Sequence, residues 1–315
     1  MNIREILLSN LGGELHSIFE NMDRFIFNDL REIRIRLGKP LMINHKGREF
    51  FVKCDGTFNK ILQDAFISNE HCIAASIELM SNYSLYAFEE EIRNGFITLE
   101  GGHRVGVSGK AVIENKTVKT IRNINGLNIR VSHQIKGCAD PVMRQIAKPY
   151  LHHTMIISPP CCGKTTLLRD IARQLSDGFG NLSGHAVGIV DERSEIAGCY
   201  KGIPQNDIGI RSDVLDCCPK EEGMLMLLRS MSPKVIVVDE IGKQNEVQAI
   251  EEIIHAGIKF ICTVHGSSIE DIQQKPVLSD LISKNIFTRF VVLESKEKAG
   301  NIAGVYDEQG RLLCI

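Results

Sequence analysis

The most informative stretch of this chain reads Ser158-Pro159-Pro160-Cys161-Cys162-Gly163-Lys164-Thr165-Thr166. It follows an apolar run and leads into helix-forming residues, which predicts a strand, a loop and a helix. A P-loop has this layout, because its backbone N–H groups point at phosphate oxygens, its Lys reaches the β- and γ-phosphates and a hydroxyl binds Mg²⁺. Gly163, Lys164 and Thr165 occupy these positions, and the dipole of the following helix adds to the attraction for an anion. Residues 158–166 are therefore predicted to bind the phosphates of a nucleotide, although Ser158 stands where the usual pattern begins with Gly.

A second stretch supports this prediction. It reads Lys234-Val235-Ile236-Val237-Val238-Asp239-Glu240, a β-branched run that ends in two carboxylates. Such a run is typical of a buried parallel strand, and open α/β sheets bind ligands at the carboxyl ends of their strands. A P-loop ATPase needs an Asp there to hold the Mg²⁺ shell, which fits Asp239, and an acid to deprotonate the attacking water, which fits Glu240. Without the P-loop, an ordinary strand ending in solvated acids would be the better interpretation.

Two further polar stretches follow predicted strands. Glu192 comes after the apolar run 187–190, and His265 comes after the run 260–264. Taken alone, each is better explained as a loop residue or as a hydrogen-bonded His. Because both are expected to flank one nucleotide crevice, we predict that Glu192 takes part in the reaction and that His265 senses the γ-phosphate.

Length and composition are typical of a cytoplasmic enzyme of two domains. The 315 residues exceed the usual size of one core, and the net charge of −2 predicts neither nucleic acid nor an anionic membrane as partner. No apolar run approaches the ~20 residues of a membrane span, and the N-terminus lacks the apolar core of a signal peptide. The ten cysteines are expected to be reduced thiols, and their spacing does not fit a structural zinc site.

The sequence predicts a domain boundary near the turn at 137–141. Before it, residues 1–138 are expected to form an α+β domain. Strands are predicted at 33–37, at 41–44 and on both sides of the glycines at 101–102, and a helix is predicted through Ile73, Ile77, Met80 and Leu85. Residues 139–315 alternate strands, near Thr154, Val187, Val235, Phe260 and Arg289, with helical stretches. This alternation favours a parallel sheet with crossover helices.

The chain resembles the stage III sporulation protein AA family of endospore-forming bacteria. The resemblance extends over nearly the whole chain. It is carried by specific motifs at 101–106, 156–170, 191–198, 229–233 and 238–242. That family is similar in turn to the secretion and pilus ATPases, which are RecA-like engines that work as hexameric rings.

The resemblance implies a fold and a place of action. The fold is α/β, with a RecA-like P-loop core of mostly parallel sheet preceded by a smaller α+β N-terminal domain. The place is the cytoplasm of the mother cell, where the ATPase docks peripherally on the membrane proteins of a channel built around the forespore.

The resemblance also implies roles for individual residues. Lys164 and Thr165 bind the nucleotide and Mg²⁺, and Asp239-Glu240 is the second Walker motif. Asp191-Glu192 resembles the acidic box of secretion ATPases, and Thr263-Val264-His265-Gly266 resembles their histidine box. Arg104 and Arg122 match the places from which the N-terminal domain sends arginines toward the phosphates.

The chain departs from the family at Cys161, where Gly is usual. A glycine at this place commonly has positive φ, and a residue with a Cβ loses about 1–2 kcal/mol in the left-handed region. The substitution is either tolerated in a weak or slow ATPase, or it makes a redox-sensitive loop, because a thiol near Lys164 and a helix N-terminus has a lowered pKa.

The sequence therefore predicts a Mg²⁺-dependent ATPase that hydrolyses ATP with water as nucleophile. Its cycle would move the N-terminal domain against the core and drive a secretion-type apparatus. Two alternatives stay open. One is a RecA-like ATPase that remodels nucleic acid, which the near-neutral charge and the missing aromatic-interleaved basic stripe disfavour. The other is a scaffold that binds nucleotide without turnover, which the Asp239-Glu240 pair disfavours.

Overall fold

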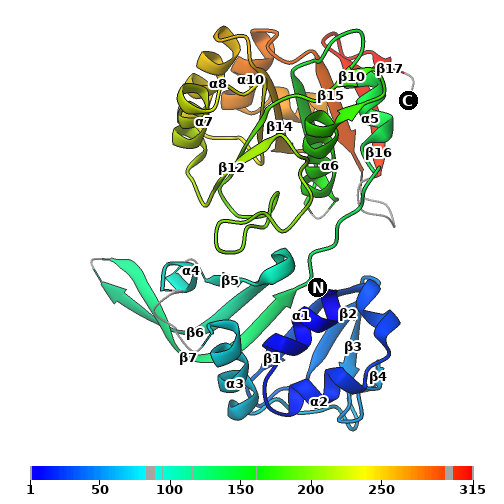
Figure 1. Cartoon of the computed structure of the whole chain (residues 1–315), viewed down its shortest axis with the longest axis vertical. Coiled ribbons are helices and arrows are strands. Elements are labelled where there is room, and N and C mark those ends of the chain that lie inside the picture. The colour runs from blue at the N-terminus through cyan, green and yellow to red at the C-terminus, as the bar shows by residue number, and fades with distance from the viewer. Residues whose placement is uncertain are drawn as a thin grey trace. The chain divides into compact units, whose positions relative to one another are not determined.

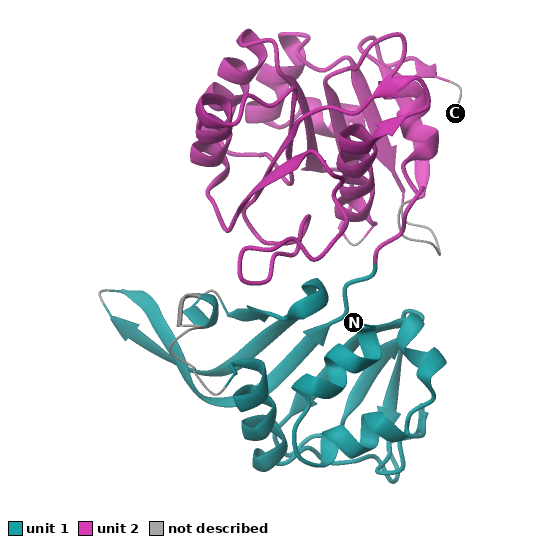
Figure 2. Cartoon of the chain, viewed as in Figure 1, with its two compact units in different colours: residues 1–133 teal, residues 134–315 magenta. Residues whose placement is uncertain are grey.

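The computed structural model describes residues 2–82, 89–93, 95–114, 116–160, 162–294 and 301–313. The chain divides into two compact units, residues 1–133 (unit 1) and 134–315 (unit 2), coloured separately in Figure 2. The division precedes the predicted boundary at 138/139 because the intervening residues are already bonded to unit 2. Gln134 Nε2 donates to the backbone carbonyl of Asp207 at 2.8 Å, and Lys136 Nζ lies 2.5 Å from the carboxylate of Asp207.

Unit 1 contains an antiparallel sheet of seven described strands in the order β4-β3-β2-β1-β7-β6-β5 (Figure 1). Its elements are α1 (Ile3–Asn10), α2 (Glu14–Asn21), η1 (Arg24–Asn28), β1 (Leu30–Arg36), β2 (Met42–His45), β3 (Arg48–Val52), β4 (Phe58–Asn59), α3 (Glu70–Met80), α4 (Glu89–Arg93), β5 (Phe96–Thr98), η3 (Glu100–Gly102), β6 (Arg104–Glu114) and β7 (Thr117–Arg130).

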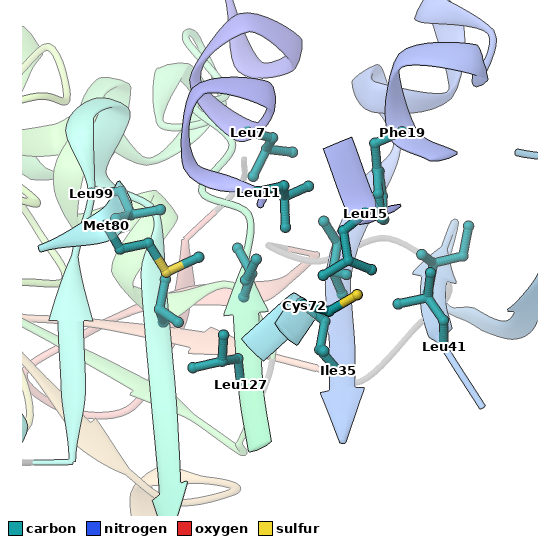
Figure 3. Close-up of a cluster of buried hydrophobic side chains, with 14 of the residues drawn as sticks. Leu7, Leu11, Leu15, Phe19, Ile35, Leu41, Cys72, Met80, Leu99 and Leu127 are labelled. Atoms are coloured by element: carbon teal, nitrogen blue, oxygen red, sulfur yellow. The ribbon is translucent and has the colours of Figure 1, made fainter. Parts of the chain in front are cut away.

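Alternating apolar residues give this sheet one buried face. In β1, Ile33 and Ile35 are buried, whereas the arginines between and after them are not. Figure 3 shows side chains from the helices, such as Leu7 and Leu15, in one cluster with Ile35 and with Leu127 of β7. The predicted strands at 33–37, at 41–44 and around the glycines at 101–102 are therefore confirmed in β1, β2, β5 and β6. The predicted helix corresponds to α3, which ends at Met80, and Leu85 lies outside the described residues.

Unit 2 contains a sheet of eight described strands in the order β12-β11-β13-β14-β8-β15-β16-β17. The first six strands are parallel, β16 pairs antiparallel with β15, and β17 pairs antiparallel with β16. The elements are α5 (Asp140–Ile146), β8 (Thr154–Ser158), α6 (Lys164–Asp177), β9 (Gly178–Phe179), β10 (Leu182–Ser183), β11 (Val187–Asp191), β12 (Ser212–Asp216), α7 (Lys220–Ser230), β13 (Val235–Val238), α8 (Gln244–His255), β14 (Lys259–His265), α9 (Ile269–Gln273), α10 (Pro276–Ser283), β15 (Arg289–Leu293), β16 (Ile302–Asp307) and β17 (Leu312–Leu313).

The central strands of unit 2 are buried on both faces. Ile156 of β8 belongs to a core with residues of α5 and α6, whereas Met155 and Ile157 on either side of it belong to a core with residues of α7, α8, α9 and α10. This double burial explains why runs such as Val235–Val238 are continuously apolar. The five strands predicted near Thr154, Val187, Val235, Phe260 and Arg289 are confirmed as β8, β11, β13, β14 and β15. Because these strands are parallel, their carboxyl ends meet at one edge of the sheet.

Candidate functional site

The predicted phosphate loop joins the carboxyl end of β8 to the start of α6. Gly163 has φ 85° and caps the helix, and this left-handed conformation is open to glycine without the penalty that a Cβ brings. Two short side chains bond within the loop: Ser158 Oγ donates to the carbonyl of Pro159 at 2.8 Å, and Cys162 Sγ lies 3.3 Å from the carbonyl of Pro160. Cys161 lies outside the described residues, so the expected strain at that position stays a prediction.

Asp239 lies beside the first turn of α6. Thr165 Oγ1 donates to Asp239 Oδ2 at 2.9 Å, and the hydroxyl of Thr263 donates to Oδ1. Thr263 belongs to β14, the strand between β13 and β8, so its side chain reaches the residues that follow β13. The sequence assigns Thr263 only to a motif, and the structure gives it two bonds, because its Oγ1 also accepts from the backbone N–H of Glu240 at 2.8 Å.

The carboxylate of Glu240 binds two cations. Lys164 Nζ forms an ion pair with Oε1, and Arg193 Nη1 lies 2.9 Å from Oε2. Burial lowers the pKa of Lys164, and the charge of nearby Asp239 opposes that effect. The side chain of Arg193 is 62% exposed, so it can reach a ligand in this place. The sequence analysis did not assign a role to Arg193.

The side chain of Glu192 points at a buried lysine. Lys220 Nζ lies 3.1 Å from Glu192 Oε2, and only 8% of the Lys220 side chain is exposed. Glu192 and Lys220 line a small recess in the site. The residues around it are Asp191, Glu192, Arg193, Glu195, Lys220, Asp239 and Glu240. Lys220 was not predicted from the sequence, because a single lysine at the start of a helix forms no motif.

Asp191, the other half of the predicted acidic box, shapes the loop that carries Glu192. Its carboxylate accepts the backbone N–H groups of Glu195, Ile196 and Ala197 at 2.8, 2.9 and 2.8 Å. Burial raises the pKa of Asp191 to about 6, against these three donors, which favour the charged form. Buried Arg169 of α6 completes the arrangement by donating to the carbonyls of Glu195 and Ile196, both at 2.6 Å. The α6 helix thereby fixes the loop next to the phosphate-binding residues.

His265 ends β14 directly beside the end of β8. It pairs in register with Ser158, and the next residue, Gly266, donates its N–H to the carbonyl of Ser158 at 3.1 Å. The side chain of His265 is exposed. The structure thus brings His265 to the phosphate loop, and its role as a sensor stays a prediction.

The two arginines predicted to reach the phosphates both belong to unit 1. Arg104 in β6 lies with its guanidinium 3.8 Å from the ring centroid of Phe96, and Arg122 in β7 is opposite Lys110 and exposed. Arg104 and Lys110 are six residues apart on β6, which is on the order of 20 Å along a strand. The structure therefore does not bring the two arginines together, and their action on a nucleotide stays a prediction.

Thr165 and Asp239 supply a hydroxyl and a carboxylate, which are hard oxygen donors. Mg²⁺ prefers such ligands and keeps several waters, so it needs few protein donors. The hydroxyl of Thr165 and the carboxylate of Asp239 therefore fit Mg²⁺. Among the described residues no cluster of three or more His, Cys, Asp or Glu side chains could hold a metal ion. In the same part of the chain, no helix combines the length and the apolar character that crossing a membrane requires.

Comparisons with known proteins agree with the architecture described above. Residues 1–313 match the family described as "Sporulation stage III, protein AA". The chain is 41% identical over 311 residues to "Stage III sporulation protein AA" of Bacillus subtilis (strain 168), covering 99% of this chain and 96% of that protein. Similar solved structures include the Yersinia pseudotuberculosis ATPase DotB, with a TM-score of 0.55 and 14% identity over 90% of this chain and 75% of that one. The pilus retraction motor PilT with bound ADP has a TM-score of 0.52 and 14% identity, covering 92% of this chain and 77% of that one. At these identities the two structures establish likeness of fold.

Proposed function

Because the chain belongs to the sporulation stage III protein AA family, we propose that it is a Mg²⁺-dependent ATPase that powers a secretion-type channel apparatus during endospore formation. One observation carries the proposal: Lys164 contacts Glu240, and Thr165 contacts Asp239, at the shared carboxyl edge of β8 and β13. DotB is an ATPase and PilT is a pilus retraction motor, and we extend their class of activity to this chain as part of the proposal.

The proposed ligands follow from the contacts. Lys164 binds a carboxylate in this structure, which supports its ability to bind the oxygens of a phosphate. Thr165 and Asp239 would hold Mg²⁺, which neutralises charge on the phosphate oxygens when it is bound. The backbone N–H groups at the start of α6 would bind the remaining phosphate oxygens, helped by the helix dipole.

The proposed reaction uses Glu240 as the base. When the phosphates of ATP take the place of its carboxylate at Lys164, Glu240 is released to accept a proton from water. The water oxygen forms a bond to the γ-phosphorus as the bond from that phosphorus to the bridging oxygen breaks, which gives ADP and phosphate. Arg193, released from Glu240 at the same time, would bind charge that develops on the phosphoryl oxygens.

The finer features of the family resemblance belong to this proposal. We expect unit 2 to be a RecA-like core, which its run of parallel strands supports. We expect the chain to assemble as a homo-oligomer, a hexameric ring, in the cytoplasm of the mother cell. Its partners would be the membrane proteins of the sporulation channel, with no direct nucleic acid partner.

A turnover assay tests the proposal. The purified full chain should release phosphate from ATP, and removal of Mg²⁺ with a chelator should stop the release. Its mass in solution should rise to that of a ring with a slowly hydrolysed ATP analogue. Turnover that depends on single-stranded DNA would favour nucleic acid remodelling instead, and nucleotide binding without turnover would favour a scaffold.

Arg104→Ala and Arg122→Ala should each lower kcat by at least ~10-fold while nucleotide binding changes little. An arginine that stabilises the charge on the transferred phosphoryl group contributes more to the transition state than to the ground state. Steady-state kinetics under assembling conditions, with thermal melting to check the fold, measure this effect. Arg48→Ala serves as the control, because Arg48 is an exposed arginine on the same sheet. If both variants hydrolyse ATP like the parent, Arg104 and Arg122 have no part in the reaction and the proposed two-domain engine is wrong.

A further inference from the structure

Lys220 has the least exposed side chain among the lysines of the site, and the proposed reaction assigns it no role. It is the first residue of α7, and 8% of its side chain is exposed. A buried ammonium group is unfavourable unless acceptors surround it. Three acceptors do so here: the backbone carbonyl of Glu240 at 2.7 Å, Glu192 Oε2 at 3.1 Å and Glu246 Oε1 at 3.7 Å. One cation therefore joins residues that follow β11 and β13 to α8.

The contact with Glu240 falls on a strained part of the backbone. Glu240 has φ 51°, in the left-handed region, which is unfavourable for a residue with a Cβ. Such a conformation persists only where the surroundings determine it. Here the N–H of Glu240 donates to Thr263 Oγ1, and its carbonyl accepts from Lys220, so both backbone polar groups of this residue are held.

The contact with Glu246 fixes the segment that follows. The other carboxylate oxygen of Glu246, Oε2, accepts the backbone N–H groups of Gly242 and Lys243 at 2.7 and 2.9 Å. Glu246 is itself buried, at 3% side-chain exposure. Lys220 thus contacts both ends of the segment 240–246. These contacts are with the carbonyl of Glu240 and with the carboxylate of Glu246, which accepts the backbone N–H groups between them. This double attachment restrains the backbone from which the Glu240 side chain leaves.

We propose that Lys220 is a positioning residue for ATP hydrolysis, which holds the backbone of Glu240 in the conformation that aims its carboxylate at Lys164 and the phosphate loop. The same ammonium group also holds the carboxylate of Glu192, which lines the same recess. The inference rests on the proposed function, since it requires Glu240 to be the base. In this proposal Lys220, whose ammonium group is held by its three acceptors, acts through Glu240.

Lys220→Met tests the inference, because Met keeps the length and the burial of the side chain and removes the charge and the donors. We expect kcat to fall by about 10- to 100-fold, whereas the affinity for ATP, measured by binding with Mg²⁺ present, stays within about threefold of the parent. A lysine with a general structural role would change both quantities.

The effect should also depend on Glu240. In the Glu240→Gln background, Lys220→Met should lower the residual kcat by no more than about twofold, because residues that act as a unit are not additive. Lys234→Met is the matched control and should keep the parent kcat, since Lys234 is an exposed lysine that precedes β13 at its opposite end. Thermal melting checks the fold, and if Lys220→Met does not fold, Lys220→Gln takes its place in both backgrounds.

The outcomes separate the two claims. A parent chain without turnover overturns the proposed function and the inference with it. An active parent with equal kcat in Lys220→Met overturns the inference alone, as does an equal fold loss in the parent and Glu240→Gln backgrounds. A loss of kcat at unchanged affinity that disappears in the Glu240→Gln background supports the assignment.

Discussion

Glu240→Gln should bind ATP and hydrolyse it at least about 100-fold more slowly than the parent. The amide has the shape of the carboxylate and leaves Asp239 with its bonds from Thr165 and Thr263, so the proposed Mg²⁺ ligands remain. The amide cannot accept the proton of the attacking water, and the chemical step therefore loses its base. The measurement is single-turnover hydrolysis at saturating ATP, together with equilibrium binding of the same nucleotide.

Glu252→Gln is the control for this experiment. Glu252 is exposed on α8, so the same chemical change there should leave turnover unaltered. Parent-like hydrolysis by Glu240→Gln would refute the assignment of the base. A loss of binding together with turnover would mean instead that Glu240 holds the nucleotide.

Lys164→Ala should abolish both nucleotide binding and turnover. The change removes the one point charge that the loop itself aims at the phosphates, and the Lys164 side chain is only 12% exposed, so water screens it poorly. We expect the affinity for ATP to fall by at least about 100-fold, which titration calorimetry or a fluorescent nucleotide can measure. Turnover at accessible ATP concentrations should fall below detection.

Lys284→Ala provides the comparison. Lys284 is paired with Glu251 and Asp280 at 2.7 and 2.8 Å, but it is 46% exposed, and such surface pairs contribute little. Binding by Lys164→Ala with the affinity of the parent would show that the nucleotide is held elsewhere. The two lysine variants together distinguish a specific phosphate contact from a general loss of positive charge.

The sequence predicted the central strands of unit 2 better than its edges. The run Val235–Val238 is fully buried, and full burial requires the continuous apolar pattern that identifies a strand. The edge strand Ser212–Asp216 is only half-buried and alternates weakly, so it gave no comparable pattern. The strands Ile302–Asp307 and Leu312–Leu313 were missed as well, because β16 is only partly buried and β17 has two residues, so neither contains a continuous apolar run.

In the candidate site, too, the sequence predicted the residues that belong to local patterns and not those placed by tertiary packing. Lys164, Thr165, Asp239 and Glu240 were predicted together because each follows the end of a parallel strand, and parallel strands bring those ends to one edge. The sequence analysis did not assign roles to Arg193, Lys220 or Glu246. The contact of Arg193 depends on β11 lying beside β13, and the contacts of Lys220 and Glu246 depend on how α7 packs against β11 and α8. No short motif encodes these arrangements.

Under the proposed function, the ion pair between Lys164 and Glu240 would make the nucleotide affinity a difference between two free energies. A nucleotide that binds through Lys164 would first have to break this interaction within the chain, so every 1.4 kcal/mol in that pair would lower the apparent affinity about tenfold. A triphosphate can offset the free energy lost with the ion pair through contacts from its terminal phosphate to Lys164. After hydrolysis that phosphate is gone, and the Glu240 carboxylate can return to Lys164. Under the proposed function, the chain would thus carry an internal competitor for Lys164 that ADP, which lacks the terminal phosphate, displaces less readily than ATP does, and this would favour ADP release after hydrolysis.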